Sequence, residues 1–167
     1  EQKGFDMLVD VAKIVLKRNP DWKWNIVGEG EDKELLTEKI RKCGLEKQLN
    51  ICGNVNSIEE YYKKSALYVL TSRYEGFGLV LTEAKSFNLP CVSFQCPAGP
   101  AEIIKDSVNG YLINCFDIEA MAEKICNLIE DKDLRIRFSE HALDDTEKFS
   151  LSKVCKQWEV LFEELER

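Results

Sequence analysis

The stretch Ser72-Arg73-Tyr74-Glu75-Gly76-Phe77-Gly78-Leu79-Val80-Leu81-Thr82-Glu83-Ala84 decides the fold, because it joins two apolar runs of different kinds. The run before it, residues 66–70, is short, apolar and bounded, which predicts a buried strand. The run from about residue 79 to residue 87 predicts a helix. Glu75 is therefore expected just past the carboxyl end of a strand, and Glu83 in the helix that follows.

The composition of this turn predicts a ligand-binding site. In open α/β sheets, ligands bind at the carboxyl ends of the strands. Gly76 and Gly78 allow the backbone to approach a ligand closely, and the free N–H groups at the start of a helix suit an anion such as a phosphate. Because an ionised carboxylate only accepts hydrogen bonds, Glu75 and Glu83 suit the hydroxyl groups of a sugar.

Helix and strand patterns alternate along the rest of the chain, which predicts βαβ units and a parallel sheet. The predicted strands cover residues 24–27, 49–52, 66–70, 91–94 and 111–113. The predicted helices cover residues 8–18, 36–43, 58–64, 79–87, 118–129 and 151–165, the last of them capped by Ser150. We expect one α/β domain, a Rossmann-like three-layer arrangement of a parallel sheet with helices on both faces.

The bulk composition excludes several classes of protein. Of the 167 residues, 44% are hydrophobic and 32% are charged, a balance typical of soluble globular domains. The formal net charge of -7 provides no sequence-wide basic field, so we expect no nucleic-acid partner. Seven cysteines without zinc-finger spacing and a single histidine predict small buried thiols in a reducing cytoplasm and no metal site.

The ordered set of loop motifs resembles the retaining glycosyltransferases of the group 1 type, which have the GT-B fold. Glu75 and Glu83 are similar to the family's Glu-x7-Glu signature. Further stretches resemble family elements in the same order: Lys3-Gly4-Phe5-Asp6, Ile26-Val27-Gly28-Glu29-Gly30, Gly53-Asn54-Val55, and Gly99-Pro100-Ala101-Glu102-Ile103-Ile104 followed by Asn109-Gly110-Tyr111-Leu112-Ile113. Each glycine motif alone is weak evidence for the family. The ordered set, which covers most of the chain, is strong evidence.

The resemblance implies a role for each residue of the predicted site. Glu75 would be the catalytic residue, binding hydroxyls of the donor sugar and supporting charge at the reacting carbon. Glu83 would bind the ribose of a nucleotide-sugar donor such as a UDP- or GDP-sugar. Lys3 would contact the diphosphate of that donor, although a solvated terminal lysine is the alternative. The backbone at Gly76, Phe77, Gly78 and Leu79 would meet the sugar and phosphates, and Asn54 and Val55 would border the base.

The resemblance also implies that neither a metal nor a cofactor is needed. Asp131-Lys132-Asp133 is similar to the Asp-x-Asp motif of a different, metal-dependent transferase fold. Here it follows an amphipathic helix and lacks the strand context of that motif, so we expect a solvated helix end. The cations and the helix N-terminus would carry the diphosphate instead.

Residues 1–167 resemble the C-terminal, donor-binding domain of such an enzyme, truncated at its N-terminus. The family has an apolar strand before its Lys-Gly element, in the middle of the sheet, and that strand is missing here. We expect the gap to be closed by direct pairing of its flanking strands, by a partner chain or by other residues. The N-terminal acceptor domain is missing too, so the isolated domain is expected to be inactive.

The full-length enzyme would be a hexosyltransferase that moves a sugar from its nucleotide to an acceptor hydroxyl. By analogy, surface glycan synthesis is the expected setting, with a cytoplasmic location and possible peripheral association at the inner face of the membrane. Two alternatives stay open: a non-catalytic module that binds nucleotide-sugars, and a GT-B-related sugar epimerase.

Overall fold

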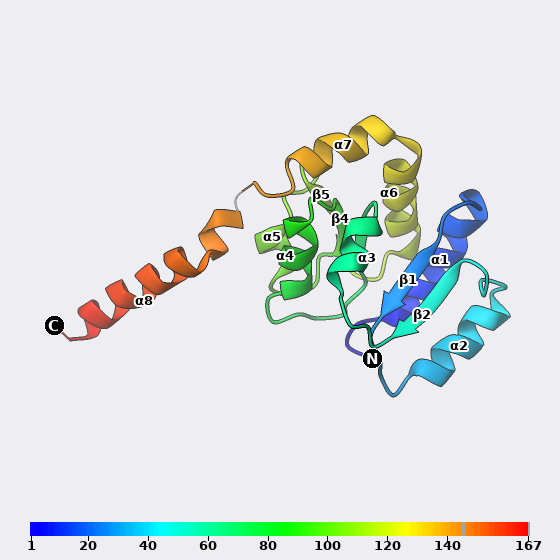
Figure 1. Cartoon of the computed structure of the whole chain (residues 1–167), viewed down its shortest axis with the longest axis horizontal. Helices are drawn as coiled ribbons and strands as arrows, with labels where there is room; N and C mark the ends of the chain where they lie inside the picture. The colour runs from blue at the N-terminus through cyan, green and yellow to red at the C-terminus, as the bar shows by residue number, and fades with distance from the viewer. Residues whose placement is uncertain (145, 167) are drawn as a thin grey trace.

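The computed structural model describes residues 1–144 and 146–166, which form a body of parallel strands and helices and a protruding C-terminal helix (Figure 1). The strands are β1 (Trp24–Val27), β2 (Leu49–Gly53), β3 (Tyr68–Leu70), β4 (Cys91–Phe94) and β5 (Gly110–Ile113). The helices are α1 (Phe5–Arg18), α2 (Lys33–Lys42), α3 (Glu59–Lys64), α4 (Leu79–Ser86), α5 (Pro100–Ile103), α6 (Ile118–Glu130), α7 (Lys132–Glu140) and α8 (Leu151–Leu165), with a 3-10 turn at Thr146–Phe149.

The expected strands and helices are confirmed, most of them within one or two residues of the predicted bounds. The short helix α5 and helix α7 were not predicted as separate elements, because neither carries a long apolar stripe. Asp131 accepts a hydrogen bond from the Leu134 amide at 2.8 Å and caps the start of α7. The Asp131-Lys132-Asp133 motif is thus a helix boundary, as expected.

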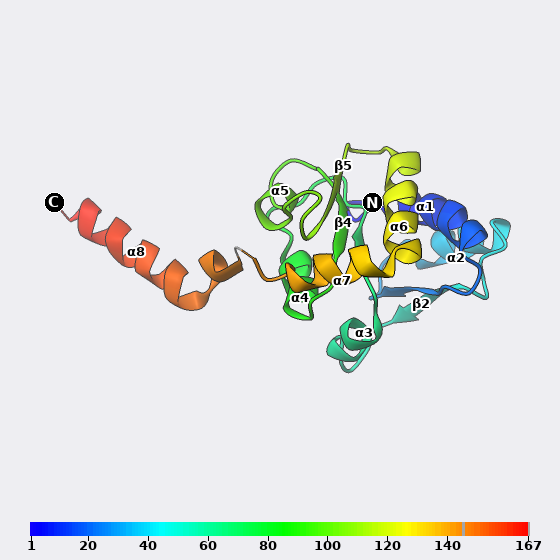
Figure 2. The ribbon, with the colours of Figure 1, turned by 90° about the horizontal axis from the view of Figure 1, so that it is seen from above.

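The strands form two parallel sheets with helices on both faces. One sheet contains β1 and β2, and the other has the order β3-β4-β5. Around the larger sheet, α6 and α1 lie on one side of β4 and α4 lies on the other (Figure 2). Because every strand pair is parallel, the loops that leave the carboxyl ends of β3 and β4 lie at one edge of that sheet.

Helix α1 holds the two sheets together, because its apolar residues face two different cores. One set packs with β1, α2 and β2: Leu8, Val9, Ala12 and Leu16. The other set packs with β4, β5, α6 and α7: Met7, Val11 and Val15. Each of these residues is at most 9% exposed, so α1 is buried over most of its circumference.

A gap separates β1 from β3, and the described residues do not close it. A cavity of about 580 Å³ lies there, lined by all four residues of β1 and by Tyr68 and Val69 of β3. Residues 1–3 form no strand. Of the three ways in which the gap was expected to be closed, direct pairing of β1 with β3 does not occur, because the two strands belong to separate sheets.

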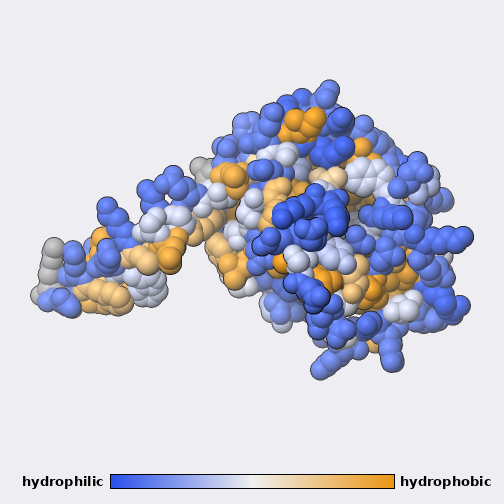
Figure 3. All heavy atoms as spheres, in the orientation of Figure 1, coloured by the Kyte–Doolittle hydropathy of each residue, from blue (hydrophilic) through white to orange (hydrophobic). Residues whose placement is uncertain are grey.

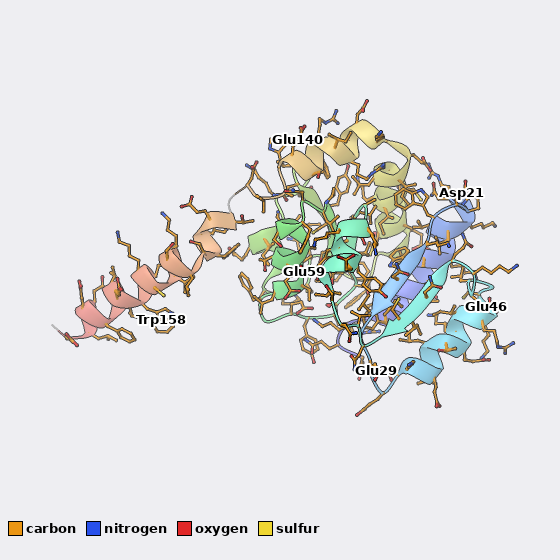
Figure 4. The ribbon with its side chains drawn as sticks, in the orientation of Figure 1. Asp21, Glu29, Glu46, Glu59, Glu140 and Trp158 are labelled. Atoms are coloured by element: carbon orange, nitrogen blue, oxygen red, sulfur yellow. The ribbon has the colours of Figure 1, made fainter. Side chains whose placement is uncertain are left out.

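Helix α8 extends away from the body as an amphipathic arm (Figures 1 and 2). It begins at Ser150, whose hydroxyl accepts from the Lys153 amide at 3.4 Å, as the sequence predicted. None of the residues described in α8 is buried, and its apolar side chains are visible along the arm in Figure 3. Trp158, 54% exposed, projects from it into solvent (Figure 4).

Among the described helices, none combines the length and the apolar character that crossing a bilayer demands.

Candidate functional site

The predicted site lies in the loop between β3 and α4, and the N-terminal residues of the chain pack directly against it. The Thr71 hydroxyl lies 3.1 Å from the Lys3 carbonyl oxygen and 3.0 Å from that of Gly4, within reach of donating to either. Gly4 has a φ of 62°, and a Cβ atom placed there would lie 2.1 Å from the Thr71 carbonyl oxygen. The Lys-Gly turn therefore requires glycine, and it positions Lys3 at the end of β3.

A second contact, from Arg73 to Asp6, fixes the same junction. The Arg73 guanidinium donates to both carboxylate oxygens of Asp6, at 2.9 and 2.7 Å. The hydrogen bond and charge of Arg73 lower the pKa of the Asp6 carboxyl below its ordinary value. The Arg73 amide also donates to the Gln2 carbonyl at 2.9 Å. A bidentate pair of this kind has a defined geometry, so the loop and the start of α1 are held as one unit.

Glu75 is held at the centre of the loop by two donors. The Lys3 ammonium donates to its Oε1 at 2.8 Å, and the Ser72 hydroxyl donates to the same oxygen at 2.6 Å. The Glu75 side chain is 7% exposed, whereas that of Lys3 is 43% exposed. Lys3 is thus accessible to an anion on one side while it neutralises a nearly buried carboxylate on the other.

Glu83 lies on α4 with an exposed side chain, and one of its oxygens is already engaged. The Tyr62 hydroxyl of α3 donates to its Oε2 at 3.1 Å. Burial and the nearby Glu83 charge raise the pKa of Tyr62, so this phenol remains a donor over the physiological range. Because Glu83 is exposed, its carboxylate is accessible from solvent.

The start of α4 supplies backbone donors between the two glutamates. Gly78, with a φ of 91°, precedes the helix, whose first turn contains no acidic side chain. Phe77 is covered from the other side by Gly99, where a Cβ atom would lie 2.1 Å from the Phe77 carbonyl oxygen. Gly76 faces open space. A cavity of about 500 Å³ opens beside Phe77 and Leu79, against the segment that leads into α8.

The segment predicted to border a nucleobase follows β2. Gly53 has a φ of 66°, and its carbonyl oxygen accepts from the Gly28 amide at 2.9 Å, which joins the ends of β1 and β2. Asn54 is exposed and Val55 is half-buried. In the described part of the chain, Lys3 and Glu75 are hydrogen-bonded to each other, whereas no hydrogen bond links Asn54 to Glu75 or Glu83.

Sequence reasoning missed the side chains that orient the two glutamates. Ser72 stands three residues before Glu75, a spacing that could have suggested a local hydrogen bond. Arg73 and Asp6 are 67 positions apart, and Tyr62 and Glu83 are 21 apart. Their partners depend on how the elements pack, so no local pattern marks them.

The chain is similar to known proteins in sequence and in fold. The family described as "Glycosyl transferases group 1" matches residues 1–145. The chain is 40% identical over 157 residues to the amylovoran biosynthesis glycosyltransferase AmsD of Erwinia amylovora, and the match covers 94% of this chain and 44% of that protein. The chain therefore spans less than half the length of this curated relative.

Two solved structures show where the resemblance lies. A crystal structure of a Staphylococcus aureus TarM mutant in complex with fondaparinux, α-GlcNAc-glycerol and UDP superposes with a TM-score of 0.93 at 34% identity, over 97% of this chain and 33% of that one. The C-terminal domain of a group 1 family glycosyl transferase from Francisella tularensis superposes with a TM-score of 0.78 at 31% identity, over 90% of this chain and 81% of that one. With the fold of the C-terminal half of a GT-B enzyme and the family match over most of its length, the chain belongs to the group 1 family of glycosyl transferases.

Proposed function

We propose that this chain is the donor-binding domain of a retaining hexosyltransferase, which moves a sugar from a nucleotide-sugar to an acceptor hydroxyl. The observation that carries the proposal is the unequal state of the two glutamates on either side of the α4 N-terminus. Glu75 is nearly buried and paired with Lys3, whereas Glu83 is exposed with one oxygen anchored by Tyr62. Two carboxylates in such different surroundings suit two different parts of one ligand.

Glu75 is assigned to the sugar and Glu83 to the ribose. Glu75 lies where a carboxylate of fixed orientation could accept hydrogen bonds from sugar hydroxyls and stabilise positive charge at the reacting carbon. Lys3 and the first amides of α4 would hold the diphosphate, with the backbone from Gly76 to Leu79 against the sugar. Asn54 and Val55 would complete the site at the base.

The diphosphate is proposed to be held by these cationic and backbone donors without a divalent metal. The ammonium of Lys3 supplies one positive charge, and the helix terminus supplies partial positive charge. Donor affinity measured with and without chelator tests this point. Affinity that disappears when chelator is added would contradict it.

The two glutamates are separated by calorimetry on the full-length enzyme with UDP, GDP and their sugar conjugates. Glu83→Ala should weaken both the nucleotide diphosphate and the intact donor, whereas Glu75→Ala should weaken the donor and spare the free nucleotide. Each loss should be roughly ten- to a hundredfold, the effect of removing a hydrogen bond to a charged group. Glu46→Ala, an exposed glutamate far from the loop (Figure 4), is the control and should bind both ligands like the parent.

Each result has a defined consequence. If both variants bind both ligands like the parent, the site assignment is wrong. If binding follows the proposal but the full-length protein transfers no sugar to any acceptor, the alternative of a non-catalytic binding module is favoured. Conversion of the donor sugar without any acceptor would favour the epimerase alternative.

In the proposed enzyme, the domain that binds the acceptor lies outside the 167 residues of this chain. Its relatives include the amylovoran enzyme named above, and surface glycan synthesis at the inner face of the membrane is proposed for this protein on that analogy alone. The isolated 167-residue chain should transfer no sugar, because a single half of a two-domain cleft leaves the reacting groups exposed to water. Turnover by the isolated chain would contradict this proposal.

A further inference from the structure

Tyr62 connects two parts of the molecule that sequence reasoning treated separately. It lies in α3, the helix that follows the Gly53-Asn54-Val55 segment. Its hydroxyl donates to Glu83 in α4, the next helix along the chain. The side chain is only 6% exposed, although α3 itself is a short surface helix with charged residues on its outer face. The buried phenol therefore directs its hydroxyl at Glu83, the residue predicted to contact the ligand.

The ring of Tyr62 is fixed on two sides by other aromatic side chains. It stacks on Phe87 with ring centroids 5.3 Å apart and planes inclined by 22°, and it lies 6.0 Å from the ring of Tyr68. Such packing leaves the side chain little rotational freedom. The position of its hydroxyl, and hence of the Glu83 oxygen that accepts from it, is therefore set by the aromatic cluster.

The direction of the hydrogen bond is also determined. Burial, and then the charge of Glu83, raise the pKa of Tyr62 well above its ordinary value, so the phenol keeps its proton and donates. Oε2 of Glu83 is the acceptor, and Glu83 itself is exposed on α4. The bond selects one orientation of a side chain that would otherwise sample many on an exposed helix surface.

We propose that Tyr62 is a positioning residue for nucleotide binding: its hydroxyl holds Oε2 of Glu83 so that the other carboxylate oxygen meets the ribose hydroxyls. The inference rests on the proposed function of Glu83 and extends it to a residue on a different helix. The aromatic cluster then acts on the ligand through Glu83 alone, without touching the ribose.

The test compares Tyr62→Phe with the parent in the full-length enzyme, using UDP and its 2′,3′-dideoxy analogue as probes. GDP and its dideoxy analogue replace them if the nucleotide panel selects guanine. Tyr62→Phe keeps the ring and removes the donor, so UDP should bind about 3- to 20-fold more weakly, the loss of one orienting hydrogen bond. The dideoxy analogue, which lacks the hydroxyls that Glu83 would accept from, should bind within about twofold of the parent affinity.

Two further variants make the outcomes distinguishable. Tyr68→Phe removes a phenol hydroxyl from the same aromatic cluster without removing the Glu83 donor, and it should leave UDP binding unchanged. Glu83→Gln tests the proposed function itself. If Glu83→Gln binds UDP like the parent, both the ribose assignment and this inference fail.

If Glu83→Gln weakens UDP but Tyr62→Phe does not, the proposed function stands and the positioning role is overturned. Equal weakening of UDP and the dideoxy analogue by Tyr62→Phe would mean that the hydroxyl merely supports the fold. The same conclusion follows if Tyr68→Phe weakens UDP as much as Tyr62→Phe does. Selective loss of UDP affinity in Tyr62→Phe alone supports the inference.

Discussion

At the residue scale, the loop between β3 and α4 depends on close backbone approaches that permit only glycine. Gly4 and Gly99 each leave no room for a Cβ atom, because a carbonyl oxygen of the neighbouring segment lies where it would be. Both have positive φ angles as well. These two positions bring segments that are distant in sequence into contact around Glu75.

Replacement of Gly4 by alanine should destabilise the fold by about 2–4 kcal/mol, from an unfavourable φ and a collision with the Thr71 carbonyl. Gly44→Ala is the matched control: its φ is also positive, at 69°, but a Cβ atom there meets open space. That change should cost only about 1–2 kcal/mol. Urea denaturation measures both, and equal losses would show that the close contact at Gly4 is relieved at no cost.

Thiol reactivity gives a second prediction at this scale. Burial raises the pKa of Cys91 to about 12, so at pH 8 only about one thiol in ten thousand is ionised in the folded protein. Cys155, exposed on α8, should react with a disulfide reagent rapidly, and Cys91 only on unfolding. Since the pKa of Cys91 is raised on folding, its contribution to stability is full below about pH 9 and is lost as the pH rises toward 12. Rapid labelling of Cys91 in the native protein would contradict this burial.

At the scale of single elements, the sequence predicted the strands and helices well because apolar spacing and breakers mark them directly. Trp24–Val27 and Cys91–Phe94 were predicted with their observed bounds. The family resemblance assigned Lys3 and Glu75 to one site but did not predict that they pair with each other, and the Tyr62 contact followed from nothing in the sequence. Apolar periodicity also cannot say what covers a stripe, which is why α8 has a clear amphipathic pattern and yet no buried residue.

The contrast between α8 and α7 predicts unequal effects of removing an aromatic ring. Trp158→Ala on α8 should change the free energy of unfolding by less than about 0.5 kcal/mol, since the side chain is 54% exposed. Phe138→Ala on α7 should cost about 3–5 kcal/mol, because Phe138 is 3% exposed and packs against Tyr111. Chemical denaturation checks both, and a large loss for Trp158→Ala would mean that α8 packs against the body in solution.

At the scale of the whole molecule, the gap between β1 and β3 divides the sheet while α1 spans both parts. The Trp24 amide donates to Gln48 and the Tyr68 amide to Pro90, on the sides away from the gap. Since alternate residues of a strand direct their backbone groups to opposite edges, the amides of Asn25 and Val69 should face the gap. A strand between β1 and β3 would be the natural partner of these amides, and its presence in the full-length enzyme stays a prediction.

Hydrogen exchange tests the gap residue by residue. In the 167-residue chain, the Asn25 and Val69 amides should exchange much faster than that of Val92, whose strand β4 is paired on both sides. In the full-length enzyme, a strand between β1 and β3 should bring their protection close to that of Val92. Equal protection of all three amides in the short chain would show that the gap is closed without any added segment.

The double burial of α1 has a consequence for the order of events during synthesis. One face of α1 finds its partners within the next few dozen residues, in β1, α2 and β2. The other face packs against α6, which spans residues 118–130 and leaves the ribosome about 100 residues later. At translation rates of about 5–20 residues per second, α6 is synthesised roughly 5–20 s after α1, so Val11 and Val15 lack this packing partner for that time. During this interval the nascent chain presents an apolar helix face to the cell, so the early half of this domain is a natural client for chaperones.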